Sequence, residues 1–119
     1  MIFRIDNYVS LREAMESVNR ALAEQDVSDE RMFDARLVVS ELVGNVLRHA
    51  QTTATLAVEI EDVFVKVIVQ SDLPFVPPAV SKKAELLAES GRGLFLVDSV
   101  SEERTCTKDG QICVRIKIR

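Results

Sequence analysis

The stretch that decides the fold is Ala35–Ala50, ARLVVSELVGNVLRHA. Drawn as a helix at about 100° per residue, it gathers its apolar side chains on one face, and Glu41 and Asn45 lie one turn apart along a border of that face. A carboxylate and an amide at the edge of a core can hold a water molecule and a metal ion, although a solvated helix border is the plainer reading. His49 continues the same spacing of four. The apolar face comprises Ala35, Val38, Val39, Leu42 and Val46.

Two capping patterns place helices before and around this stretch. Ser10 and Glu13 form a capping-box pattern, which predicts a helix from about Leu11 to Gln25. Ser28 precedes two acidic residues, a pattern typical of a helix start, and it predicts a central helix over Asp29–Ala50.

Alternating apolar residues predict the strands. Met1–Ile5 fits a short edge strand, and Thr52–Glu61 and Val63–Gln70 fit an antiparallel pair with a tight turn between them. The chain ends in a predicted hairpin whose apolar residues alternate from Ile112 to Ile118. We therefore expect one α+β domain over residues 1–119, a two-layer sandwich whose mixed, mostly antiparallel sheet carries helices on one face.

The segment between the two predicted strand pairs is rich in proline. Ser71–Lys83 contains all three prolines, which excludes helix and central strand and predicts an irregular loop that covers a site. Ala84–Glu89 fits one helical turn. Gly91 and Gly93 then break it, and a short helix is expected to begin at Leu94.

The two cysteines, Cys106 and Cys113, flank an Asp-Gly pair. A two-residue turn there places them opposite each other, at a pair of positions where the Cα atoms are far apart. We expect free thiols in a reducing compartment and, with one histidine and no Cys-x-x-Cys pattern, no structural zinc site.

Charge and hydropathy exclude several classes of protein. The 119 residues carry 15 basic and 19 acidic side chains, a net charge of −4, without a basic run. This balance argues against direct nucleic-acid binding or an anionic membrane surface. No apolar run is long enough to span a membrane and the start is not a signal peptide, so we expect a cytoplasmic protein.

Two segments together resemble a known family. Glu41–Ala50, ELVGNVLRHA, resembles the N box of the GHKL ATPase superfamily in the ELVTNAVRHA form of the anti-sigma-factor serine kinases. Leu87–Val97, LAESGRGLFLV, resembles their G2 box. The resemblance covers nearly the whole chain in the right order, and it implies the Bergerat, or histidine kinase-like ATPase, fold with ATP and Mg²⁺ as cofactors.

The resemblance assigns roles to individual residues. Glu41 matches the general base that orients or deprotonates the attacking hydroxyl, and Asn45 matches the residue that holds Mg²⁺ against the nucleotide phosphates. Gly91 and Gly93 match the glycines that pack on the phosphates, and Arg92 between them either reaches a phosphate or stays exposed. His49 is interpreted as a structural residue at the helix end.

The chain departs from the family where adenine is recognised. The G1 box should supply an aspartate and, two residues later, a glycine, but Ser71 stands at the aspartate position and Leu73 at the glycine position. Asp72 comes one place late. A shift of one residue turns a side chain to the other face of a strand, so Asp72 can contact the nucleotide only if the strand bulges or breaks there.

The sequence is compatible with three functions. The resemblance favours an ATP-dependent serine/threonine protein kinase that binds a sigma factor or similar partner, phosphorylates an antagonist protein and forms a homodimer. The altered G1 box favours a binding module with weak or no catalysis. The catalytic domain of a histidine kinase fits less well, because no phosphoacceptor segment precedes the domain and the covering loop is short.

Overall fold

A computed structural model describes residues 1–73, 89–107 and 109–119; at residues 49–50 and 89–93 it describes the backbone path only. The described strands form one sheet of five in the order β1-β2-β3-β5-β4, with every neighbouring pair antiparallel. The strands are β1 (Ile2–Ile5), β2 (Ala54–Ile60), β3 (Phe64–Ser71), β4 (Glu103–Cys106) and β5 (Gln111–Lys117).

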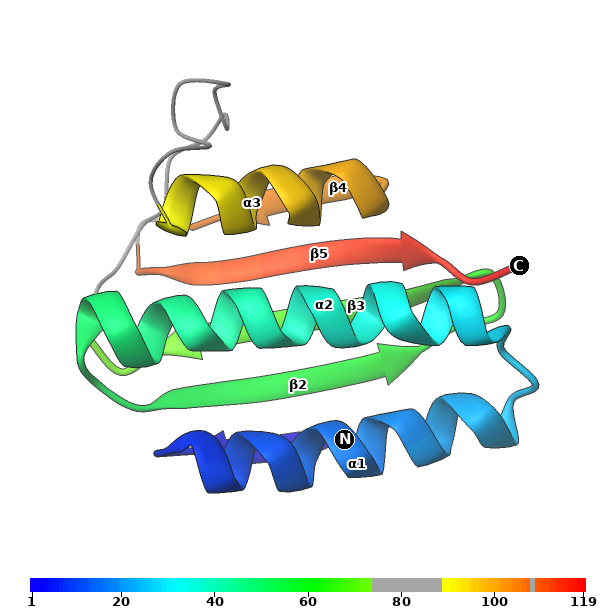
Figure 1. The fold of residues 1–119 in the computed structure, drawn as a ribbon, viewed down its shortest axis with the longest axis horizontal. Helices are drawn as coiled ribbons and strands as arrows, with labels where there is room; N and C mark the ends of the chain where they lie inside the picture. Colours follow the sequence, from blue (N-terminus) through cyan, green and yellow to red (C-terminus); the bar gives the residue numbers. More distant parts are fainter. Residues whose placement is uncertain (74–88, 108) are drawn as a thin grey trace.

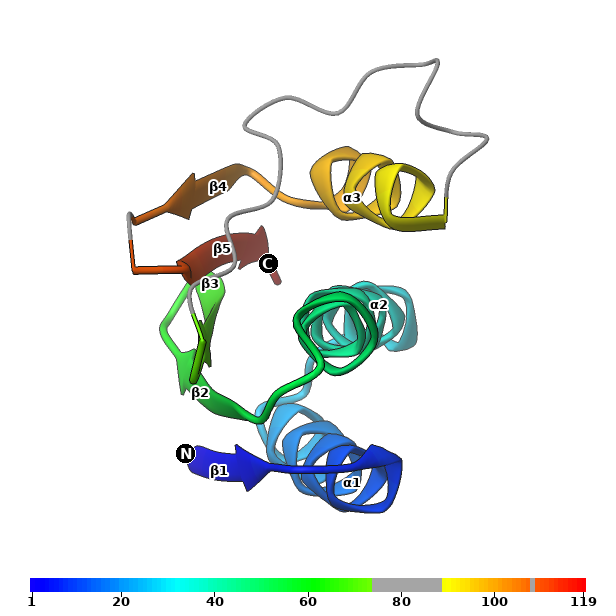
Figure 2. The same ribbon diagram turned by 90° about the vertical axis from the view of Figure 1, so that its left-hand side faces the viewer.

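The helices cover one face of this sheet and leave the other open (Figure 1, Figure 2). They are α1 (Tyr8–Glu24), α2 (Asp29–Asn45) and α3 (Glu89–Val100). The long helix α2 lies between the other two and also contacts the central strands β3 and β5 (Figure 2). The predicted α+β sandwich with helices on one face is confirmed.

Alternation along the strands builds the core. Facing residues of β2 and β3 pair from Ala54 with Ser71 to Ile60 with Val65, so buried side chains meet buried side chains across the ladder. The helices add their own buried faces, with Leu11, Val18 and Leu22 from α1 and the predicted apolar face from α2. The buried strand residues are Ala54, Leu56, Val58, Val65, Val67, Val69, Ile112, Val114 and Ile116.

Helix α1 begins one turn earlier than the sequence predicts. Asn7, not Ser10, is the N-cap: its side-chain oxygen accepts a hydrogen bond from the Ser10 backbone N–H at 2.8 Å, and Ser10 Oγ accepts one from the Asn7 backbone N–H at 3.2 Å. Ser10 therefore takes the second place of the box. The capping box at Ser10 and Glu13 is wrong because Tyr8 and Val9, which have low helix propensity, hide the first turn.

The cap gives a direct comparison of two substitutions. Asn7→Ala should lower the free energy of unfolding by about 1 kcal/mol, because it leaves the first-turn N–H groups without their acceptor. Glu13→Ala, at an exposed position inside the helix, should change it by less than about 0.5 kcal/mol. Urea denaturation of both variants measures the difference, and equal losses would contradict the cap at Asn7.

The central helix changes type at its end. Ser28 caps α2 as predicted, accepting from the Arg31 N–H at 3.3 Å. The α-helix then ends at Asn45 and continues as one π-helical turn, η1 (Val46–Ala50), before Gln51 takes a left-handed conformation with φ 51°. The predicted span is thus helical throughout, but its last turn is π, a type of turn that occurs frequently at functional sites.

The C-terminal hairpin is shifted by one residue from its predicted register. Thr107 pairs with Gln111 (N to O, 2.9 Å), and Gly110 has φ 83°, so the turn is one residue longer than the predicted Asp-Gly turn. Cys106 consequently faces Ile112 and Cys113 faces Thr105. A shift of one places the two cysteines on opposite faces of the sheet, and both are free thiols, as expected.

The start of α3 also differs from the prediction. The helix begins at Glu89 and not at Leu94, so the backbone of Gly91 and Gly93 is helical instead of forming a break. Glycine costs a helix only about 1 kcal/mol relative to alanine, which the packing of α3 against α2 offsets. The predicted turn at Ala84–Glu89 and the covering loop lie almost wholly outside the described residues.

Candidate functional site

Glu41 and Asn45 lie together on the side of α2 that faces α3. Arg36 and Ser40 line grooves toward α1, on the other side of α2. Glu41 and Asn45 are turned away from that side by their helical positions, and α3 packs along α2 there (Figure 2). The structure therefore brings the predicted base and the predicted metal ligand to one edge of one rigid helix.

Asn45 is the better buried of the two. It is 1% exposed, and its side-chain Oδ1 accepts a hydrogen bond from Nη2 of Arg48 at 3.3 Å. Glu41 is half-buried. The sequence-based reasoning missed Arg48, although the i, i+3 spacing from Asn45 on a helix is the signal that places the two side chains within reach.

Ser71 occupies the predicted aspartate position at the end of β3. It pairs with Ala54, is 3% exposed, and lies on the helix-bearing face of the sheet. Its hydroxyl donates to the backbone carbonyl of Leu73. The side chain on the helix side of this strand end is thus a buried hydroxyl and not a carboxylate.

Asp72 lies on the opposite, open face of the sheet. The ladder continues without a bulge, with the Asp72 N–H donating to the Thr53 carbonyl at 2.9 Å, so the side chain alternates away from Ser71. Arg4 Nη1 donates to its Oδ1 at 3.0 Å, and Arg4 and the Thr53 hydroxyl both donate to its other oxygen. The structure does not bring Asp72 together with Glu41 and Asn45, because the bulge that this required is absent.

The Arg4 contact has a measurable electrostatic result. Hydrogen bonds from Arg4 and then Thr53 hold the pKa of Asp72 below its ordinary value. Because the folded-state pKa is depressed, the stabilisation is present above about pH 3.9 and is lost as the pH falls through the lower folded-state pKa. A carbon-13 titration should show the low midpoint in the wild type and a return toward the ordinary value in Arg4→Gln. Arg12→Gln, which removes an exposed arginine of α1, should leave it unchanged.

The remaining predicted residues are placed by backbone only. Gly91 lies in the first turn of α3, where backbone N–H groups have no helical acceptor, and Arg92 and Gly93 follow it. α3 itself contacts α2. The side chains of Arg92 and His49 lie outside the described parts, so their predicted roles stay predictions.

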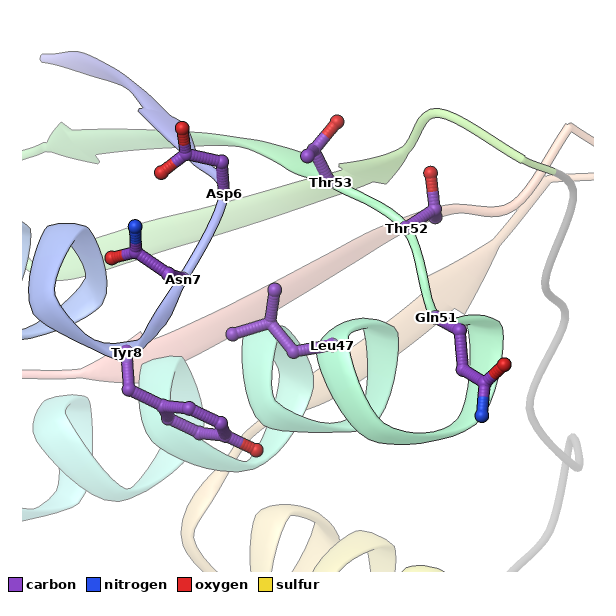
Figure 3. Close-up of a pocket in the computed structure, with 7 residues that line it drawn as sticks. All are labelled: Asp6, Asn7, Tyr8, Leu47, Gln51, Thr52 and Thr53. Atoms are coloured by element: carbon purple, nitrogen blue, oxygen red, sulfur yellow. The ribbon is translucent and has the colours of Figure 1, made fainter.

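A separate pocket lies on the other side of α2 (Figure 3). It has a volume of about 440 Å³ and opens where the start of α1 faces η1 and the segment leading to β2. Neither Glu41 nor Asn45 lines it. Its lining residues are Asp6, Asn7, Tyr8, Leu47, Gln51, Thr52 and Thr53.

The residues at the α2 edge fit a magnesium ion held mainly by a nucleotide. Mg²⁺ prefers oxygen donors and commonly takes one or two from protein and the rest from phosphates and water. Asn45 would supply a buried amide oxygen, and the carboxylate of Glu41 lies one turn away. Among the described residues no group of three or more His, Cys, Asp or Glu side chains is placed to hold a metal ion.

The comparisons with known proteins agree with this geometry. The family model described as the histidine kinase-like ATPase domain matches residues 6–118. No curated protein matches the chain. The match spans both the α2 edge and the start of α3, so the two segments that resemble the N and G2 boxes fall inside one family domain. The chain belongs to the histidine kinase-like ATPase domain family.

Proposed function

We propose that this protein is an ATP-dependent serine/threonine protein kinase of the anti-sigma type. Glu41 acts as the base toward the attacking hydroxyl, and Asn45 holds Mg²⁺ against the nucleotide phosphates. Gly91, Arg92 and Gly93 at the start of α3 contact the phosphates.

The position of Glu41 and Asn45 supports the proposal most strongly. Both residues lie on one edge of α2, beside α3, in a chain whose family domain covers residues 6–118. Phosphoryl transfer depends on positioning and on neutralising charge, and a rigid helix that holds a carboxylate and an amide oxygen one turn apart suits both.

Calorimetric titration with ATP tests nucleotide binding. We expect binding in the presence of Mg²⁺, and we expect Asn45→Ala to weaken it at least about tenfold, the loss of about 1.4 kcal/mol of binding free energy. In EDTA the two proteins should bind ATP equally. Asn19→Ala on α1 is the matched control. A wild-type chain that does not bind ATP at millimolar concentration would contradict the proposal.

A second candidate is a family member that regulates its partner by occupancy, with weak or no catalysis. The observation that favours it is the position of Asp72, which is engaged by Arg4 on the open face of the sheet while Ser71 takes the inner position. Partner binding that is equally tight with and without nucleotide would support it, and ATP-dependent phosphorylation of the partner would exclude it.

The partners and location belong to the same proposal. We infer a sigma factor or similar protein as one partner, an antagonist protein as the phosphorylated one, a homodimeric assembly, and a cytoplasmic location. None of the described helices combines the length and apolar character needed to cross a membrane. Light scattering of the purified chain measures the assembly directly.

A further inference from the structure

The guanidinium of Arg48 donates a hydrogen bond to Oδ1 of Asn45, the atom that would bind the metal ion in the proposed function. Arg48 follows Asn45 by three residues, in η1, and its Nη2 donates to Asn45 Oδ1 at 3.3 Å in a partly buried contact. The hydrogen bond fixes which way the amide points. It also places a permanent positive charge beside the only oxygen that the side chain of Asn45 has to offer.

Gly44 provides the space for this arrangement. A Cβ added at Gly44 would lie 2.9 Å from Nη1 and 3.4 Å from Cζ of Arg48, closer than ordinary contacts allow. A side chain at residue 44 would therefore require the guanidinium to shift from its present position. Glycine destabilises a helix interior relative to alanine, and here it allows Arg48 to fold back along the helix.

We propose that Arg48 is a positioning residue for Asn45 that makes metal binding depend on nucleotide. The guanidinium orients the amide oxygen and, in the absence of nucleotide, opposes a divalent cation at that oxygen, since like charges at a partly buried site are poorly screened. The phosphates of a nucleotide bring negative charge that offsets both cations. The inference rests on the proposed function, but its effect is measurable without nucleotide.

Manganese, which broadens nearby nuclear resonance signals, is the probe for this test. In the wild-type chain without nucleotide, the side-chain amide signals of Asn45 should resist broadening. In Arg48→Met and in Gly44→Ala they should broaden at an Mn²⁺ concentration at least about fivefold lower, the lower end of ordinary coupling between sites. Arg48→Lys retains the charge and should stay closer to the wild type than Arg48→Met.

Two controls separate this effect from a general change of the protein. The side-chain amide of Asn19 on α1 is the internal reference, and Arg36→Met removes an exposed arginine from the same helix. Equal responses of the wild type and Arg48→Met would overturn the proposal. A Gly44→Ala variant that responds like the wild type would overturn the role of Gly44.

The dependence on nucleotide has its own measurement. Adding ADP to the wild type should bring broadening of the Asn45 signals at low Mn²⁺, and no change in a chain that calorimetry shows to bind ADP would overturn that dependence. A wild type that binds no nucleotide removes the proposed function but leaves the metal titration of the three variants readable.

Discussion

Glu41→Gln is expected to lower the rate of phosphate transfer by about 10²- to 10⁴-fold while ATP still binds. Glutamine keeps the size of the side chain and its hydrogen-bonding oxygen, but it cannot take a proton from the attacking hydroxyl. Glu41 is half-buried on the α3 side of α2, so the substitution leaves the core unchanged. Transfer of labelled γ-phosphate from ATP to a purified antagonist protein measures the rate, and calorimetry measures the affinity.

Glu16→Gln is the matched control for this substitution. Glu16 is an exposed carboxylate on α1 that lines a groove remote from the α3 side of α2, and its loss changes the net charge by the same amount. It should transfer phosphate at the wild-type rate. A Glu41→Gln protein with full activity would contradict the role of Glu41 as base, whatever the affinity for ATP.

Leu42→Ala is expected to lower the free energy of unfolding by about 2–5 kcal/mol. Leu42 is 0% exposed on the core face of α2, and truncation removes its apolar contacts and leaves a cavity beneath the helix that carries the site. The loss is a large part of the about 5–15 kcal/mol that holds a typical domain folded. Urea denaturation should show a lower midpoint with the same slope.

Phe33→Ala provides the comparison on the same helix. Phe33 is larger than Leu42 but 63% exposed, so its truncation should change the free energy of unfolding by no more than about 0.5 kcal/mol. Equal losses in the two variants would contradict the packing of α2, because burial and not side-chain size should decide the cost.

The sequence predicted the fold well where a periodic pattern was long. The 3.6-residue period over Ala35–Val46 and the alternation over β2, β3 and β5 correctly assigned the buried faces, because burial on one side of an element imposes that period. Local features at element ends were less predictable. Asn7 competes with Ser10 as a cap, and the turn before Gln111 accepts either two or three residues, so the order of residue types alone fixes neither.

In the candidate site, too, some features could be predicted from the sequence and others could not. The Glu41 and Asn45 pair follows from helical spacing alone, and the structure places both on one edge. The contact between Arg48 and Asn45 depends on side-chain conformation and on the missing Cβ of Gly44, which no periodic pattern encodes. The position of Asp72 depends on whether β3 bulges. The ladder stays regular beyond Ser71, so the side chain of Asp72 lies on the open face of the sheet.

A nitrogen-15 titration of the wild-type chain with ATP and Mg²⁺ tests directly whether the α3 side of α2 binds the nucleotide. The largest shifts are expected at the backbone amides of Glu41, Asn45 and the start of α3. The amides of Arg4 and Thr53 on the open face of the sheet should stay unmoved. Saturable shifts confined to the open face, or no shifts at millimolar ATP, would contradict a nucleotide site on the α3 side of α2.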